Sequence, residues 1–348
     1  MPSLFSSSSK RSSQGSPSKK SDSGVAAEGS LSDASLSAVV PPPPPPPPAV
    51  LGPERSSGTG AEASCGCTTK GVDSVRLSNG EGAFFQLRTG PNYKKNGKKA
   101  HSKPHMYEPV SIDFFKRESI LSHVSEHLTL PPPPDGAVTN ESGVPRRLVI
   151  NLVVPIEPPP LLRSNTDGAC YQIVCVFAAA SDVLKAWQDE ASPAAKLFAR
   201  FVQNAPEGLL PETGDLDIKE RIKIIPWIEN AKEVGLPGWL EGYNGKPALL
   251  TKSGSIHRGD DYLEITMNLF RFGFLTRKGM HHLTPTLGIF QLHCALTIEG
   301  REDDELDERA ILACNVQGVD LVNLAKSGIL PDGPPLGSPS SKSTKSTK

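Results

Sequence analysis

Two neighbouring stretches decide the fold, IKERIKIIPWIEN at residues 218–230 and RGDDYLEITMNLF at residues 258–270. In the second stretch apolar and polar residues alternate over YLEITMNL, which is the period of a β-strand. The first stretch alternates over IKERIKII, and Pro226 is expected to end that strand. A strand with one apolar face keeps its register, because a slip of one residue would expose every apolar side chain. The two stretches therefore predict a sheet with one dry face and one polar face.

Composition limits the classes of function. The 348 residues carry 37 Lys and Arg against 38 Asp and Glu, so the chain has no general attraction to nucleic acid, and we expect no nucleic-acid partner. We recognise neither a secretory signal nor an apolar segment that could span a bilayer. The expected location is therefore the cytoplasm, with peripheral contact to membranes. Six cysteines are scattered through the chain, mostly in apolar runs, which indicates reduced thiols.

Low-complexity sequence flanks a central region. Residues 1–80 are rich in Ser, Gly, Ala and Pro without an apolar period, so they are predicted to be a disordered tail. Residues 81–331 are predicted to fold as one domain, and residues 332–348 to form a second disordered tail. The prolines at Pro41–Pro48 are either a stiff spacer or a ligand for a polyproline-binding domain. The serine-rich start, with four basic residues before its first acid, is either disordered or an organelle transit peptide.

The central region has the pattern of an α+β domain. Near-continuous apolar runs at residues 147–154 and 171–178 predict central strands that are covered on both faces. A Ser-Pro pair at residues 192–193 is typical of a helix start, and apolar side chains follow it at helical spacing. We expect a curved, mainly antiparallel sheet with one long packed helical segment. Another helix is expected at residues 304–314, because its first residues are acids, which the helix dipole favours.

Two groups of side chains are candidates for a binding site. The first is a basic loop that could meet phosphates or anionic lipid headgroups, or be only a solvated hairpin tip: Lys94, Lys95, Lys98, Lys99 and Lys103. The second belongs to the polar faces and ends of predicted strands, and would form one polar surface or line a cavity if those strands pair: Arg221, Lys223, Arg258, Glu264, Asn268 and His293. The alternative for this second group is a solvated sheet face.

Motifs for catalysis and metal binding are not recognised. The sequence shows no phosphate-binding glycine loop, no G-x-S-x-G or H-E-x-x-H, and no paired cysteines at metal-ligand spacing. We therefore expect no catalytic residue, no metal and no cofactor.

Several segments resemble, in order and spacing, the C-terminal domain of the plant enhanced-disease-resistance-2 protein family. The matching segments are FQLRTGPNY at 85–93, LVINLVVP at 148–155, RIKIIP at 221–226, RGDDYLEI at 258–265 and ELDERAIL at 305–312. The resemblance implies that residues 81–331 form this domain. Residues 1–80 lack the apolar pattern of the pleckstrin-homology and START domains that often precede it in the family.

Together with the basic loop, the resemblance implies a non-enzymatic regulatory module associated with lipid or membrane. Its ligand would be an anionic phospholipid or another lipid. One alternative is an uncharacterised enzyme that uses Glu264 and His293 in a cavity. The other alternative is a scaffold that recruits a partner through its polyproline tract.

Overall fold

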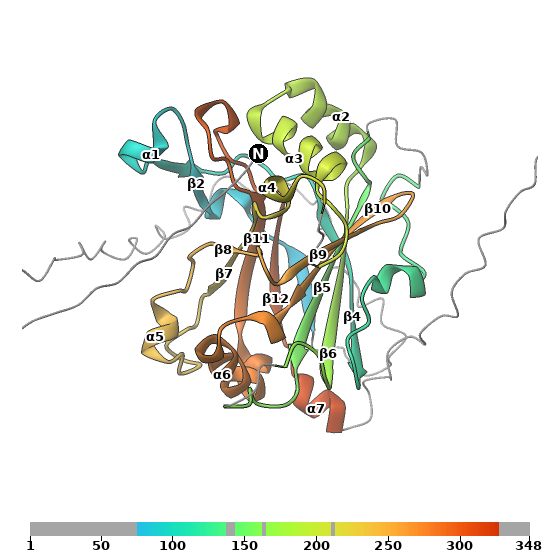
Figure 1. Cartoon of the computed structure of the whole chain (residues 1–348), viewed down its shortest axis with the longest axis vertical. Coiled ribbons are helices and arrows are strands. Elements are labelled where there is room, and N and C mark those ends of the chain that lie inside the picture. Colours follow the sequence, from blue (N-terminus) through green and yellow to red (C-terminus); the bar gives the residue numbers. More distant parts are fainter. Residues whose placement is uncertain (1–74, 137–142, 162–164, 210–212, 327–348) are drawn as a thin grey trace, which may run out of the picture. The chain divides into compact units, whose positions relative to one another are not determined.

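The computed structural model describes residues 75–136, 143–161, 165–209 and 213–326 (Figure 1). All of these belong to one of the two units of the chain, residues 58–348. The polyproline tract at Pro41–Pro48 and the predicted tail at 332–348 lie outside the described residues.

The strands form two five-stranded sheets and one two-stranded sheet. The first sheet is antiparallel throughout and contains, in spatial order, β1 (Arg76–Asn79), β12 (Leu312–Gln317), β11 (Gln291–Ile298), β7 (Ile222–Ile228) and β8 (Ala248–Leu249). The second contains β4 (Glu108–Arg117), β6 (Cys170–Ala178), β5 (Arg147–Pro155), β10 (Tyr262–Asn268) and β9 (Gly254–Arg258), with only β5 and β10 parallel. The short sheet pairs β2 (Gln86–Arg88) with β3 (Lys99–His101).

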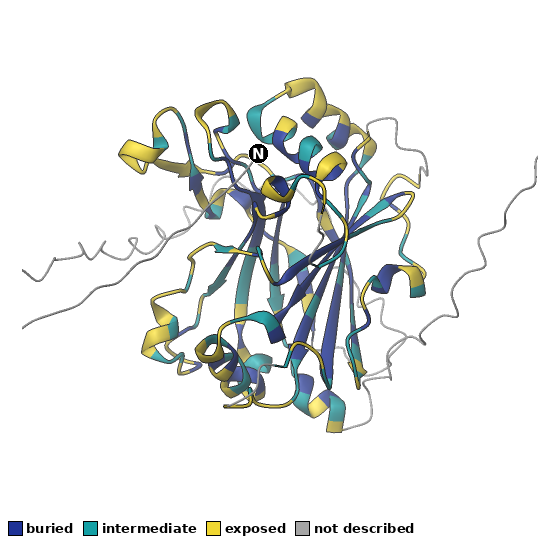
Figure 2. Cartoon of the chain, viewed as in Figure 1, coloured by how far each residue is buried: buried dark blue, intermediate teal, exposed yellow. Residues whose placement is uncertain are grey.

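The helices lie at the ends and edges of the sheets. They are α1 (Tyr93–Asn96), α2 (Ser181–Glu190), α3 (Pro193–Asn204), α4 (Leu216–Lys219), α5 (Gly238–Glu241), α6 (Phe274–Leu283) and α7 (Leu321–Lys326) (Figure 1). Turns of 3-10 helix occur at Gly82–Phe84, Val124–His127, Leu269–Arg271, Thr284–Ile289 and Asp303–Glu305. Exposed residues concentrate on the helices and loops, whereas the strands are mostly buried (Figure 2).

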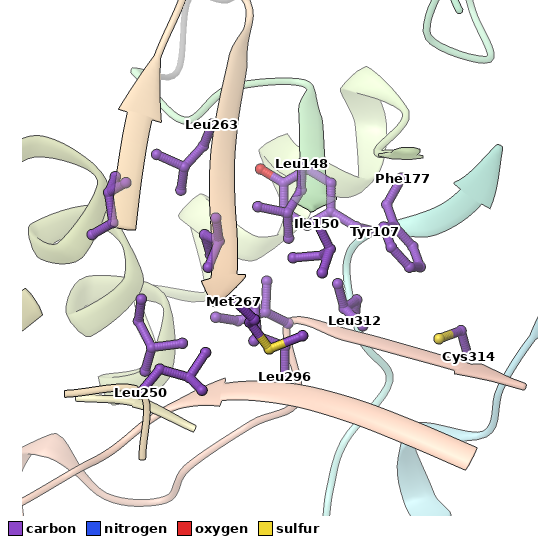
Figure 3. Packing of buried hydrophobic residues seen from close by; sticks show 14 of the residues in the cluster. Tyr107, Leu148, Ile150, Phe177, Leu250, Leu263, Met267, Leu296, Leu312 and Cys314 are labelled. Atoms are coloured by element: carbon purple, nitrogen blue, oxygen red, sulfur yellow. The ribbon is translucent and has the colours of Figure 1, made fainter. Parts of the chain in front are cut away.

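The main core lies between the two five-stranded sheets. Leu148 and Leu263 of the second sheet share one apolar cluster with Leu296 and Leu312 of the first sheet (Figure 3). Helix α3 adds buried side chains to the same cluster, including Phe198. The helix begins as predicted, because the Ser192 side chain accepts a hydrogen bond of 3.3 Å from the Ala195 N–H.

The predicted α+β class is therefore confirmed, and the strands at residues 147–154 and 171–178 are buried members of the second sheet. The strands are divided between two sheets, however, and do not form one curved sheet. β7 pairs with β11, whereas β10 pairs with β5 and β9. The stretches at residues 218–230 and 258–270 thus belong to different sheets.

Three local predictions are wrong. The predicted helix at residues 304–314 is a 3-10 turn followed by β12, because Leu312 and Cys314 alternate into the core. Pro226 does not end its strand, since β7 continues to Ile228 and Pro226 pairs with Cys294. β1 lies inside the segment predicted as a tail, and pairs along its length with β12.

The predicted polar face of β10 is also dry. Glu264 is fully buried, and Thr266 and Asn268 are nearly so. The Glu264 carboxylate accepts hydrogen bonds from the backbone N–H groups of Val124 at 3.1 Å and Ser125 at 2.8 Å. A loop thus covers this face, and the carboxylate satisfies backbone donors that would otherwise be buried without partners.

Candidate functional site beneath the basic loop

The basic loop, residues 94–103, begins between β2 and β3, includes β3 and ends just after it, and its first part has a defined backbone. Asn92 and Gly97, at φ of 65° and 61°, flank the single turn of α1, and this left-handed conformation suits Asn and Gly. The Asn96 side chain donates a 3.1 Å hydrogen bond to the Pro91 carbonyl and accepts a 2.8 Å bond from the Lys98 N–H. The loop is therefore held in shape by its own side chains.

The five lysines of this loop differ in their partners. Lys94 lies 2.8 Å from a Glu302 carboxylate oxygen and Lys103 lies 2.7 Å from Glu190, but both ammonium groups remain about two-thirds exposed. Such pairs contribute little, roughly 0–1 kcal/mol, and exchange readily with solvent or a ligand. Three lysines are exposed and form no ion pair with any residue that the structure describes: Lys95, Lys98 and Lys99.

Residues 299–311 connect β11 to β12, and we call this connection the acidic turn. A cleft of about 710 Å³ lies between the basic loop and residues 300–306 of the acidic turn. The Asn92 N–H donates to the Asp303 carboxylate at 2.9 Å and so ties the loop to the acidic turn. The cleft is lined by cations from both sides and by two carboxylates: Arg88, Lys94, Lys95, Arg301, Glu302 and Asp303.

Two arginines lie at this cleft and are held in position. Arg88 pairs with Glu299 at 2.7 Å and donates to the Gly300 carbonyl at 3.2 Å, while its guanidinium lies 4.9 Å from the centre of the Tyr93 ring. Arg301 pairs with the other oxygen of Glu299 at 2.9 Å and also with Asp217. Their guanidinium groups are thus bound to carboxylates and a carbonyl of the protein, and they shape the wall of the cleft.

Below the cleft lies a buried ion-pair cluster. The Lys223 ammonium is 2.6 Å and 2.7 Å from the two oxygens of Glu308, and their side chains are only 4% and 0% exposed. Burial lowers the pKa of Lys223, although the Glu308 carboxylate opposes this effect. Arg221 binds Glu305 at 2.7 Å and also pairs with Asp217. These contacts join β7 to the acidic turn.

Glu305 is held ionised by its surroundings. Burial alone would raise its pKa, but hydrogen bonds from the Arg301 N–H and from the Arg221 guanidinium outweigh burial and hold the pKa below its ordinary value. Glu305 is therefore committed to Arg221, whereas Glu302 pairs with Lys94 and Asp303 accepts from the Asn92 N–H.

The candidate polar residues from the sequence do not form one surface. Arg221 and Lys223 belong to the buried cluster of the first sheet, whereas Glu264 is buried in the second sheet. His293 lies on β11, where its ring nitrogen is 3.0 Å from Glu229. Glu264 and His293 are thus on different sheets with separate partners, and the prediction of one continuous polar face is wrong.

Two further candidates have structural contacts. Arg258 donates to the Val202 carbonyl at 2.8 Å and also to the Ala205 carbonyl, where α3 ends. Asn268 accepts a 2.9 Å hydrogen bond from the Phe270 N–H and so caps the following 3-10 turn. Neither residue faces the cleft under the basic loop.

Sequence reasoning missed most of the charged residues beneath the cleft. They are Arg88, Glu299, Arg301, Glu305 and Glu308. The signal that could have found them is REDDELDER at residues 301–309, in which both signs of charge are dense. Three of the segments quoted for the family resemblance, at residues 85–93, 221–226 and 305–312, meet here through their charges.

Metal-ligand clusters and cysteine thiols can be checked directly in the described ranges. These ranges contain no group of three or more His, Cys, Asp or Glu side chains that could hold a metal ion. Burial raises the pKa of Cys170 and of Cys294 to about 12, so these thiols stay protonated near neutral pH. No helix within those ranges has the length and apolar character needed to cross a membrane.

One of three comparisons with known proteins identifies a family. A family model described as "Protein ENHANCED DISEASE RESISTANCE 2, C-terminal" matches residues 78–320, well over half of the chain. The matched range contains the basic loop, the acidic turn and the buried cluster. No curated protein and no solved structure matches the chain.

Proposed function

The chain belongs to the family of the C-terminal domain of Protein ENHANCED DISEASE RESISTANCE 2, and from the charged loop and its cleft we propose that it is a non-enzymatic regulatory module that binds anionic membranes. The contact would be the basic loop, with the phosphate of a lipid headgroup entering the cleft beside Lys94 and Lys95. This function is compatible with a cytoplasmic protein that meets membranes peripherally.

The observation that carries the proposal is the outward charge of a preorganised loop. Lys95, Lys98 and Lys99 are exposed, while the backbone that presents them is fixed by Asn96 and by the bond from Asn92 to Asp303. Each lysine near an anionic surface contributes about 1 kcal/mol. Because the loop is already ordered, binding costs little conformational entropy.

The weaker ion pairs at the rim support the same function. Lys94 and its partner Glu302 are both about two-thirds exposed, so a headgroup phosphate can replace the carboxylate without uncovering a buried charge. The arginines at the cleft keep their own carboxylates, so they shape the site rather than move into it.

We expect Lys95→Gln, Lys98→Gln and Lys99→Gln together to weaken binding to anionic vesicles by about two orders of magnitude, because roughly 3 kcal/mol of attraction is lost. Vesicle flotation would measure the effect. A matched control replaces three exposed lysines elsewhere, Lys116, Lys185 and Lys196, and changes the net charge equally. Equal losses in both variants would show that only the net charge matters, and no loss in the loop variant would remove the loop from the contact.

A further inference from the structure

A second exposed surface lies where α5 meets α6. The Trp239 ring lies against the backbone of α6, since a Cβ added at Gly279 would come within 2.5 Å of it. Only glycine permits so close an approach. Around this contact several large apolar side chains are exposed to solvent: Trp239 by 44%, Tyr243 by 66%, Phe274 by 39% and Leu275 by 68%. We name these four residues and the two helices the α5–α6 corner (Figure 1).

A packed base supports the corner. Leu240 of α5 joins an apolar cluster with Leu283 of α6 and with Phe290, which begins the approach to β11. Trp239, Phe274 and Leu275 are therefore presented by helices, and Tyr243 lies in the turn that directly follows α5. Large apolar groups that stay in water on an ordered surface indicate an interaction site.

The charge around the corner is one-sided along α6. The chain has no Asp or Glu between Ile265 and Ile298, and within this interval α6 carries Arg277, Lys278, His281 and His282. Lys278 and His282 are exposed, whereas Arg277 is buried and binds Asn165. α5 ends at the acid Glu241, and the exposed Lys246 lies five residues later, outside the helix.

This combination suits one kind of partner, an anionic bilayer surface. Aromatic side chains such as Trp and Tyr prefer the headgroup region, and an aliphatic side chain beside them gains by entering the acyl boundary. The exposed Lys278 of α6 would meet a lipid phosphate. A two-fold contact between copies of this chain is the competing interpretation of the corner, and the test below distinguishes it.

We infer that the α5–α6 corner is a second membrane contact, which inserts Tyr243 and Leu275 at the interface of an anionic bilayer while Lys278 binds headgroups. The inference rests on the proposed membrane function, but it concerns a surface built from residues other than the basic loop. The loop supplies charge with little apolar area, whereas the corner supplies apolar area with less charge.

The test compares the double variant Tyr243→Gln and Leu275→Gln with the wild-type chain on phosphatidylcholine vesicles with and without phosphatidylserine. Because both side chains are mostly exposed, the fold should tolerate the changes, and a thermal melt would check this. We expect at least about tenfold weaker flotation on the anionic vesicles, since binding follows the apolar area that enters the interface. Leu216→Gln on α4 is the matched control, as Leu216 is 42% exposed and lies outside the corner.

The possible results separate the two proposals. If the wild-type chain floats and the corner variant floats equally well, the corner is not a contact, while the membrane function stands. If the wild-type chain does not float on anionic vesicles, both proposals fail. If the variant changes only the molecular mass measured by light scattering, the corner is an interface between copies and the inference is overturned. A Lys278→Glu variant that also floats less than the wild-type chain would support it independently.

Discussion

Glu308→Ala is expected to destabilise the folded chain by about 3–5 kcal/mol, because it leaves the Lys223 ammonium buried without its counter-ion. The loss extends beyond this pair, since the same carboxylate accepts a 3.0 Å hydrogen bond from the Gly300 N–H and lies 3.8 Å from Arg88. Urea unfolding would measure the change in free energy. The expected effect is a large fraction of the stability of an ordinary domain.

The matched control for Glu308 is Glu302, another carboxylate of the same turn. Glu302→Ala removes the exposed pair with Lys94 and the side-chain cap of the 3-10 turn at Asp303–Glu305, so we expect a smaller loss of about 1–2 kcal/mol. Replacing both members of the buried pair by apolar residues, Lys223→Met with Glu308→Leu, should recover most of the lost stability. Similar small effects for Glu308→Ala and Glu302→Ala would show that the buried pair is hydrated and unimportant.

Phe198→Ala is expected to cost about 3–5 kcal/mol of unfolding free energy through the cavity that it leaves. The Phe198 side chain is 1% exposed, lies edge-on to the Tyr107 ring with centroids 6.1 Å apart, and stacks with Phe201 at 6.5 Å. Lys196→Ala on the exposed side of the same helix should change stability by less than about 0.5 kcal/mol. If Phe198→Ala also had almost no effect, α3 could not be part of the main core.

The sequence was most informative where a local pattern already determines the environment. The apolar runs of β5 and β6 indicate burial on both faces, and the Ser192 cap with its apolar stripe predicts α3. The pairing of strands is not local information. β10 lies parallel to β5, more than a hundred residues earlier in the chain, and no alternation within either strand specifies that neighbour.

The predicted environments of several polar residues are wrong, because contacts with distant segments bury these side chains. The period of β10 places Glu264 on a polar face, but a distant loop covers that face and donates its backbone N–H groups to the carboxylate. The acids near residue 305 were assigned to a helix start, whereas Glu305 binds Arg221, just before β7, and Glu308 binds Lys223 of β7. The basic loop could be found because a dense run of lysines has few ways to be buried, but its ion pairs with Glu302 and Glu190 could not.

The most direct test of the proposed membrane function is equilibrium binding of the unmodified chain to vesicles that differ only in anionic lipid. We expect binding to anionic vesicles and not to neutral ones at about 0.1 M salt, where electrostatic attraction extends over roughly 10 Å. Binding should fall steeply towards about 1 M salt, where this range shrinks to about 3 Å. Equal binding to neutral and anionic vesicles, or no binding to either at low salt, would contradict a membrane contact made through the charged loop.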